Sequence, residues 1–346
     1  MSAVLVAPER LQAATATCRQ LLAQLDRILL GQEDLHRLVL TGILSRGHIL
    51  LEGLPGLGKT ALVKALGSVL QLTFKRVQFT PDLMPGDILG SHILQDDGQG
   101  RREMVFRPGP VFTNLLLADE INRASPKTQS AMLETMQEQS VTLLGTTRPL
   151  PQPFFVLASQ NPIELEGTYP LPEAQLDRFL FRLLVRPPPA AVVSAIIHER
   201  RRGESPQPTW SLSGAELQEL FAVMDGIFLA KAVADYIARL VEATHPEADS
   251  APAAVREYVT YGASPRAAIA MAEAARGQAL LAGRPTASFA DVRAVVGPVL
   301  NHRLILSYKA RLDRMTATQV VERLLEAVRP VELDLPRELQ VRETPA

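Results

Sequence analysis

Gly53-Leu54-Pro55-Gly56-Leu57-Gly58-Lys59-Thr60 decides the fold, because this stretch fits the pattern G-x-x-x-x-G-K-[ST] at every fixed position. Its glycines let the backbone curl, so that successive N–H groups point inward at an anion. An apolar run at 48–52 precedes the stretch, and helical spacing from 60 to 72 follows it. We therefore expect a phosphate-binding loop between a buried strand and a helix. Lys59 would reach the β- and γ-phosphates, and Thr60 would coordinate Mg²⁺. The alternative is a glycine-rich turn with an incidental lysine.

A second pair of candidate catalytic residues, Asp119 and Glu120, ends the apolar run 115–118. Ligands of parallel sheets bind beyond the carboxyl ends of the strands, where the phosphate-binding loop would also open. We expect Asp119 to hold Mg²⁺ through water and Glu120 to polarise the attacking water as a general base. Taken alone, two acids after an apolar run commonly form a strand end and a solvated turn. The phosphate-binding loop makes the catalytic interpretation the stronger one.

Short apolar runs alternate with helical spacing over the first half of the chain, which predicts an α/β fold with a parallel sheet sandwiched by helices. The candidate strands lie at 48–52, 74–79, 115–118, 154–159 and 179–185. Two further segments predict projecting hairpins. One spans 88–107 around Asp96-Asp97-Gly98, and the other spans 140–150 around Gly145.

The expected domain organisation follows from these elements. Residues 1–30 form an N-terminal helix, and residues 31–187 form the sheet domain, with hairpins inserted at about 84–110 and 138–151. Three prolines at 187–189 mark the boundary, since they can neither continue a strand nor sit inside a helix. Residues 190–330 form a smaller all-helical domain, and 331–346 form a polar tail. The helices of the all-helical domain are expected at 190–202, 213–224, 231–244, 265–281, 289–300 and 316–328.

Composition narrows the class of protein. The chain has 346 residues, 47% of them apolar and 21% charged, and no segment approaches the roughly 18 apolar residues of a membrane span. We expect a cytoplasmic protein without membrane insertion. The single cysteine, Cys18, excludes an internal disulfide and is expected to be a buried residue of a helix. The net charge of −1 argues against charge-driven nucleic-acid binding by the whole surface.

Several longer strings resemble the MoxR family of AAA+ ATPases. They are GLPGLGKT from Gly53, ADEINRASPKTQSAMLETMQE from Ala118, SQNP from Ser159, PEAQLDRF from Pro172 and YGASPRA from Tyr261. The resemblance runs from about residue 30 to 302. It implies that the helical domain is the lid of an AAA+ ATPase, and that ATP and Mg²⁺ are the ligands.

The resemblance also implies roles for single residues. Asn161 matches the first sensor, which positions water near the γ-phosphate. Arg178 resembles the arginine finger supplied to a neighbour's ATP, and Arg266 resembles the second sensor, carried by the lid. Gly31 and Gln32 resemble the segment that meets the adenine base. The implied nucleotide-binding loop comprises Gly53, Leu54, Pro55, Gly56, Leu57, Gly58, Lys59, Thr60 and Ala61. Without the resemblance, Asn161-Pro162 indicates a turn, and Arg178 indicates a surface residue paired with Asp177.

A finger supplied in trans requires a homo-oligomeric ring, usually of six subunits. The resemblance implies that ATP hydrolysis in the ring remodels or activates a client protein, often with a partner that bears a von Willebrand factor A domain. Such pairs assist metal or cofactor insertion and complex assembly, and the hairpins face the pore or a partner. One alternative is a nucleic-acid motor that uses Arg101, Arg102, Arg107 and Arg148 of the hairpins. Another is a nucleotide-gated scaffold without catalysis.

Overall fold

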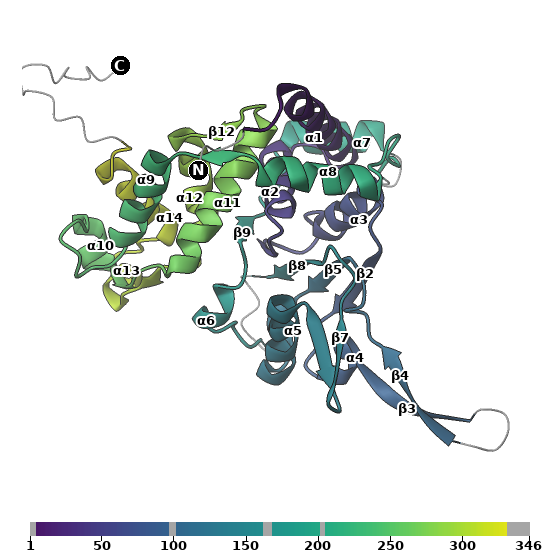
Figure 1. Cartoon of the computed structure of the whole chain (residues 1–346). Helices are drawn as coiled ribbons and strands as arrows, with labels where there is room; N and C mark the ends of the chain where they lie inside the picture. The colour runs from purple at the N-terminus through teal and green to yellow at the C-terminus, as the bar shows by residue number, and fades with distance from the viewer. Residues whose placement is uncertain (1–4, 97–101, 162–167, 201–204, 331–346) are drawn as a thin grey trace, which may run out of the picture.

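The computed structural model describes residues 5–96, 102–161, 168–200 and 205–330. At its centre lies a parallel sheet with the strand order β2-β5-β8-β1-β9 (Figure 1). The strands are β1 (Ile49–Glu52), β2 (Phe74–Gln78), β5 (Leu115–Asp119), β8 (Phe155–Gln160) and β9 (Phe181–Leu184). Each coincides with an apolar run predicted as a strand to within two residues at either end, so the predicted parallel sheet is confirmed.

The register of this sheet determines which residues share an edge. Leu51 of β1 lies beside Ser159 of β8, and Ala118 of β5 lies beside Ala158. Because all the strands run the same way, the residues that follow β1, β5 and β8 emerge together at the carboxyl edge. That edge is where the glycine-rich loop begins.

Helices cover both faces of the sheet, because alternate strand residues point to opposite sides. Leu50, Leu116 and Val156 face a smaller core that includes residues of α5 (Pro126–Glu138). Ile49 and Leu117 face a larger core. On that side lie α1 (Pro8–Ile28), α2 (Glu33–Leu44) and α3 (Lys59–Val69). Cys18 of α1 is buried there, as predicted, and burial raises the pKa of its thiol to about 12.

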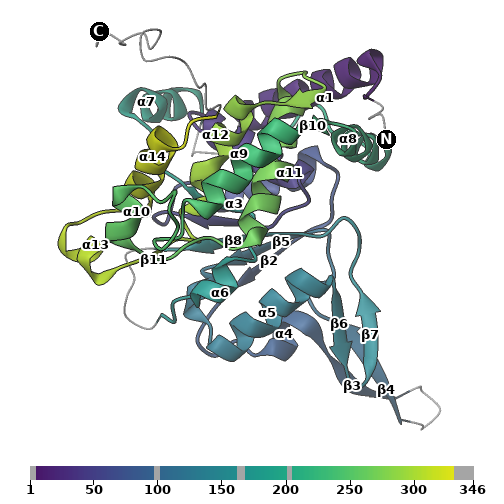
Figure 2. The same cartoon turned by 60° about the vertical axis from the view of Figure 1, so that its left-hand side comes forward.

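Two hairpins project from the sheet, as predicted (Figures 1 and 2). The first follows α4 (Pro85–Leu89) and pairs β3 (Gly90–Asp96) with β4 (Arg102–Pro108), while residues 97–101 of its expected turn lie outside the described residues. The second pairs β6 (Ser140–Leu143) with β7 (Thr146–Pro149). Leu144 and Gly145 between them have φ of 48° and 75°, which a tight two-residue hairpin turn requires.

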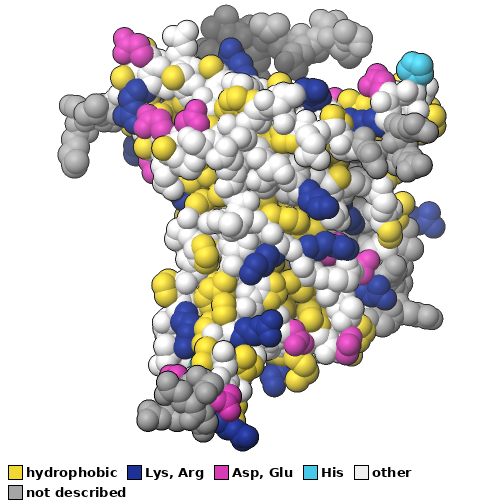
Figure 3. Space-filling model, turned by 90° about the vertical axis from the view of Figure 1, so that its right-hand side faces the viewer, with side chains coloured by type: hydrophobic (Ala, Val, Ile, Leu, Met, Phe, Trp, Pro, Cys, Tyr) yellow, Lys and Arg dark blue, Asp and Glu magenta, His cyan; other side chains and the backbone are white. Residues whose placement is uncertain are grey.

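The two hairpins contact each other. The Arg148 guanidinium lies 4.0 Å from the centroid of the Phe106 ring, a cation–π contact between β7 and β4. The first hairpin also exposes several hydrophobic side chains, namely Ile93, Leu94, Met104 and Val105. Figure 3 shows the face at the right of Figure 1, where hydrophobic side chains lie interspersed with separate Lys and Arg side chains.

The described residues beyond 189, namely 190–200 and 205–330, are mostly helical, as predicted. The helices are α7 (Ala190–Glu199), α8 (Gly214–Asp225), α9 (Lys231–Glu242), α10 (Ala253–Tyr258), α11 (Pro265–Leu281), α12 (Phe289–Leu300), α13 (Tyr308–Leu312) and α14 (Ala317–Ala327). The short helices α10 and α13 were not predicted, and neither were two short strand pairs. They join β10 (Phe228–Leu229) to β12 (Thr286–Ala287), and β11 (Val259–Tyr261) to β13 (Ile305–Leu306). Strands of two or three residues are too short to show an alternating pattern.

The larger core continues from the sheet into this helical region. Buried residues of α8, α9, α11 and α12 belong to the same cluster as those of α1, α2 and α3. The Leu212 N–H, just before α8, donates to the carbonyl of Val69 at the end of α3. Among the described residues, no helix is long and apolar enough to cross a membrane.

Candidate nucleotide-binding site

The glycine-rich loop lies between the end of β1 and the start of α3, as predicted. Gly56 and Gly58 have φ of 80° and 83°, a left-handed conformation that side chains with a Cβ rarely adopt. A Cβ at Gly53 would lie 2.7 Å from the Val185 carbonyl oxygen, so this position also excludes larger residues. The loop thus turns its backbone toward the N-terminus of α3, where N–H groups and the helix dipole favour an anion.

Lys59 is the first residue of α3, and its side chain turns back over the loop. Its Nζ donates to the Gly53 carbonyl at 2.6 Å. Burial lowers the pKa of Lys59, and the nearby carboxylates of Asp119, Glu120 and Glu52 oppose that shift. The ammonium group therefore lies in the field of the two acids expected to serve the metal and the water.

Asp119 ends β5 at the same edge, and it is held by Ser159 at the corresponding level of β8. The Ser159 hydroxyl donates to Asp119 Oδ1 at 2.5 Å and accepts from the Glu120 N–H at 3.0 Å. This serine was not predicted as a site residue, although it begins the string SQNP. The signal that could have identified it is a hydroxyl at the carboxyl end of the neighbouring strand.

The edge strand β2 contributes two more partners that sequence reasoning missed. Arg76 donates to Asp119 Oδ2 from Nη2 at 2.7 Å and from Nε at 3.1 Å. Gln78 donates to Glu120 Oε2 at 2.6 Å. Polar residues on a strand at the edge of a sheet indicate only exposure, so nothing in the pattern distinguishes these two.

Glu120 has a strained backbone, with φ of 55°, directly after the strand. Its carboxylate also accepts from Arg123 Nη1 at 3.0 Å. Left-handed non-glycine residues cluster at functional sites, where the surrounding structure holds them in place. Here the Ser159 hydroxyl and the side chains of Gln78 and Arg123 hold Glu120.

The remaining residues predicted at this edge also lie there. Asn161 is buried and directly follows β8, and the Gly53 N–H donates to the carbonyl of the preceding Gln160 at 3.3 Å. Thr60 and Ala61 lie in the first turn of α3. Pro162, which follows Asn161, lies outside the described residues, so the turn predicted at Asn161-Pro162 is not described.

The segment expected near the base approaches the same loop through Leu29, two residues before Gly31. Gly31 has φ of 72°, and Gln32 Nε2 donates to the Arg186 carbonyl at 3.0 Å. Both line a cleft of about 570 Å³ between the start of α2, the end of β9 and the helical region. The preceding Leu29 packs so close to Gly58 that a Cβ there would lie 2.9 Å from it.

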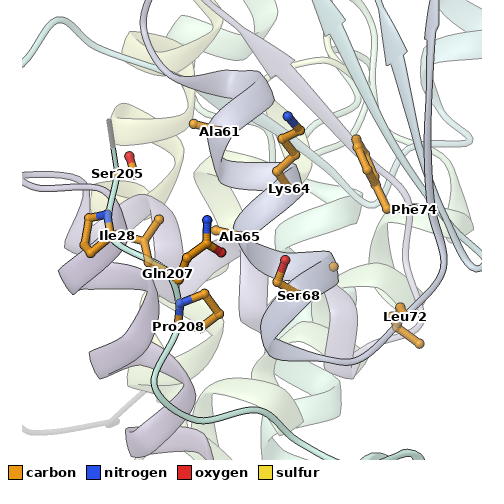
Figure 4. Close-up of a pocket in the computed structure, with 12 residues that line it drawn as sticks. Ile28, Ala61, Lys64, Ala65, Ser68, Leu72, Phe74, Ser205, Gln207 and Pro208 are labelled. Carbon is orange, nitrogen blue, oxygen red and sulfur yellow. The ribbon is translucent and has the colours of Figure 1, made fainter. Parts of the chain in front are cut away.

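A second cleft follows the outer side of α3 (Figure 4). It measures about 410 Å³, and Ala61 and Lys64 line it near the start of the helix, with Phe74 and Leu72 on one side. The segment 205–208 forms the opposite wall. Of the residues predicted to bind the nucleotide, Ala61 lies in this cleft.

Arg178 and Arg266 lie together, but not beside Lys59. Both line a cleft of about 180 Å³ that also includes His48, at the start of β1. Gly53 follows the other end of that strand, five residues away, and about 3.3 Å per residue makes the separation roughly 16 Å. The structure thus gathers Lys59 and the acids at one edge of the sheet and the two arginines at the other.

Asp177 has different partners from the one that the sequence suggested. Its ion pairs are with Arg303 at 2.7 Å and Arg266 at 3.6 Å, both from the helical region. Ser264 donates to it as well, at 3.1 Å. The interpretation of Arg178 as the ion-pair partner of Asp177 is therefore not what the structure shows.

The residues at the carboxyl edge fit a magnesium nucleotide. The Thr60 hydroxyl and the Asp119 carboxylate are hard oxygen ligands, which Mg²⁺ prefers and supplements with waters and phosphate oxygens. The left-handed glycines and the Lys59 ammonium suit a polyphosphate. This fit rests on the donor set and on the glycine cradle.

The fold and this site define the class of AAA+ ATPases. The sequence profile "ATPase family associated with various cellular activities (AAA)" matches residues 48–181, and the "AAA lid domain" profile matches 251–324. The chain is 37% identical in sequence to a protein of known crystal structure, a "putative ATPase" from Cytophaga hutchinsonii. The match covers 93% of this chain and 97% of that one, with a TM-score of 0.85.

Relatives narrow the class to a family. "Chaperone MoxR1" of Mycobacterium tuberculosis is 45% identical over 92% of this chain and 84% of its own length. "Protein MoxR" of Paracoccus denitrificans is 33% identical over 85% of this chain and 90% of its own length. The chain belongs to the MoxR family of AAA+ ATPases.

Proposed function

We propose that this protein binds Mg-ATP at the carboxyl edge of its sheet and hydrolyses it with the help of a neighbouring subunit. The observation that carries the proposal is the split arrangement of the site residues. The phosphate loop, Asp119 and Glu120 share one edge, whereas Arg178 and Arg266 share the opposite edge. Neither half is complete alone, and a second copy would join them.

The residues at the carboxyl edge have distinct roles in this proposal. Lys59 and the loop amides hold the β- and γ-phosphates, and Thr60 and Asp119 hold Mg²⁺, which neutralises charge that develops on the phosphates. Glu120 orients the attacking water and accepts its proton. Asn161 fixes the position of that water near the γ-phosphate. Gly31 and Gln32 contact the base.

Arg178 and Arg266 would complete the neighbouring site. Arg266 lies in the first turn of α11, where the helix dipole disfavours a cation, and its side chain is 55% exposed. A phosphate group of the neighbour's nucleotide would compensate the positive charges of Arg178 and Arg266. Arginines supplied in trans raise turnover by about 10³ to 10⁵ in other phosphoryl-transfer systems. A head-to-tail contact of this kind repeats until a ring closes, and six subunits is the size that we propose.

The biological role that we propose is a chaperone-like remodelling or activation of a client protein complex. Membership of the MoxR family and the chaperone name of the Mycobacterium relative support it. The projecting hairpins, which expose hydrophobic side chains, are suitable contacts for a client or for a partner with a von Willebrand factor A domain. We place this activity in the cytoplasm.

The test is ATP turnover measured across protein concentrations. We expect activity per chain to rise steeply with concentration as rings form. Glu120→Gln should keep ATP affinity but lower kcat by on the order of 10³-fold or more, because the water loses its base. Turnover that is independent of concentration, or unchanged in Glu120→Gln, would contradict the proposal.

A further inference from the structure

One buried arginine binds the segment that carries Arg178. Arg303 follows α12, and its side chain is 3% exposed. All five of its N–H donors have acceptors. Nε donates to Asp177 Oδ1 at 2.7 Å, Nη1 donates to the carbonyls of Leu180 at 3.2 Å and Val299 at 2.6 Å, and Nη2 donates to the carbonyls of Asp177 at 3.2 Å and Phe179 at 2.7 Å.

These bonds surround one residue. Asp177, Phe179 and Leu180 accept through backbone or side-chain oxygens, and Arg178 is the residue between them. The neighbouring His302 adds a contact from Nε2 to the Phe179 carbonyl at 3.1 Å. The fifth acceptor, Val299, belongs to α12, so the guanidinium joins the segment to the helical region.

The same segment is joined to α11. Ser264 donates to Asp177 Oδ2, and Arg266 lies 3.6 Å from the same oxygen. The position of Arg178 relative to Arg266 is therefore determined by Asp177 and Arg303 together. A lysine at 303 could not reproduce this, since it has three donors on a flexible stem rather than a planar fork.

We infer that Arg303 is a positioning residue for Arg178. It fixes the segment that carries Arg178 to the helical region, so that Arg178 and Arg266 meet a neighbour's nucleotide as one unit. This inference rests on the proposed function, in which Arg178 acts on a neighbouring subunit. Arg303 itself touches no nucleotide, because it lies buried behind the segment. Its removal should displace Arg178 while leaving the chain's own phosphate loop intact.

The first experiment is a double-mutant cycle in kcat. Arg303→Lys should lower kcat on the order of 10- to 100-fold, because displacing a catalytic group by about 1 Å costs that much. ATP affinity should change less than twofold. In an Arg178→Ala background, Arg303→Lys should lower kcat no further. Equal losses in both backgrounds, or unchanged kcat in the single variant, would overturn the inference.

A matched control lies on α12. Arg293 is exposed and donates to the Leu325 carbonyl, so Arg293→Lys should leave kcat unchanged. Thermal unfolding would show whether Arg303→Lys folds. If it does not, His302→Gln removes a weaker contact to the same segment, and its smaller loss of kcat should vanish in the Arg178→Ala background. A loss that persists there would overturn the inference.

Mixed subunits separate this inference from the proposed function. Arg178→Ala mixed with Glu120→Gln should regain turnover, because one chain supplies an intact site and the other an intact finger. Failure of that pair would refute the action of Arg178 in trans. If that pair regains turnover but Arg303→Lys mixed with Glu120→Gln does not, only the inference about Arg303 is refuted, and the proposed function stands.

Discussion

At the scale of residues, Ser159 joins the two acids of the site, since its hydroxyl donates to Asp119 and accepts from the Glu120 N–H. The acids and the phosphate loop could be predicted because each follows an apolar run in a recognised pattern. Ser159, Arg76 and Gln78 could not, because they are single polar residues on strands. Their role depends on which strands are neighbours, and that is a property of the folded sheet.

We expect Ser159→Ala to lower kcat by roughly tenfold, because Asp119 and Glu120 lose the group that fixes both. The lost bond to a buried carboxylate should also reduce the free energy of unfolding by about 1–3 kcal/mol. Steady-state turnover and urea unfolding measure the two effects. Ser130→Ala is the control, since that exposed hydroxyl only accepts from Gln175. Unchanged kcat in Ser159→Ala would show that the hydroxyl does not position the acids.

At the scale of elements, His48 joins two strands and a helix. Its Nδ1 accepts from the Val156 N–H of β8 at 3.1 Å, and its Nε2 therefore carries the proton donated to the Met136 carbonyl of α5 at 3.0 Å. The strands themselves were predicted from their apolar runs. Their order was not, and neither was this contact, because pairing between distant segments leaves no local pattern.

Burial lowers the pKa of His48 to about 4, against the opposing bond to Met136, so the folded protein keeps the ring neutral. In the unfolded chain, His48 has its ordinary pKa near 6.5, so below that pH the unfolded chain binds more protons than the folded protein does. The free energy of unfolding therefore falls as the pH falls from about 6.5 toward 4. His48→Gln does not titrate. Between pH 7 and 5, its free energy of unfolding should fall by roughly 2 kcal/mol less than that of the unmodified protein.

Urea unfolding at both pH values measures this difference. His302 also has a pKa held well below its ordinary value, chiefly by burial and by Arg303, so the variant should keep part of the pH dependence. Identical pH dependence in the two proteins would show that His48 titrates alike when folded and unfolded.

At the scale of the whole molecule, sequence reasoning placed the acids at the carboxyl edge with the phosphate loop, but it did not place Arg178 and Arg266 at the opposite edge. The resemblance named Arg178 and Arg266, yet their place opposite the phosphate loop follows from the direction of β1 and β9 and from the packing of the helical region on Asp177. Local propensity carries no information on such distant packing.

The nucleotide-free chain should unfold in a single step, because one core spans the sheet and the helical region. Trp210, the single tryptophan, packs against that core, so its fluorescence reports the core's loss. Urea transitions followed by fluorescence and by far-ultraviolet circular dichroism should coincide. Two separated transitions would show that the helical region folds independently.

The unbroken core has a mechanical consequence. If the helical region moved as a lid relative to the sheet in each cycle of ATP hydrolysis, apolar side chains of this core would be separated. Their exposure to water costs about 25 cal/mol for each Å². Rotation of whole subunits against each other leaves that packing untouched. We therefore expect the power stroke to appear as changing angles between rigid neighbours rather than as bending inside any one of them.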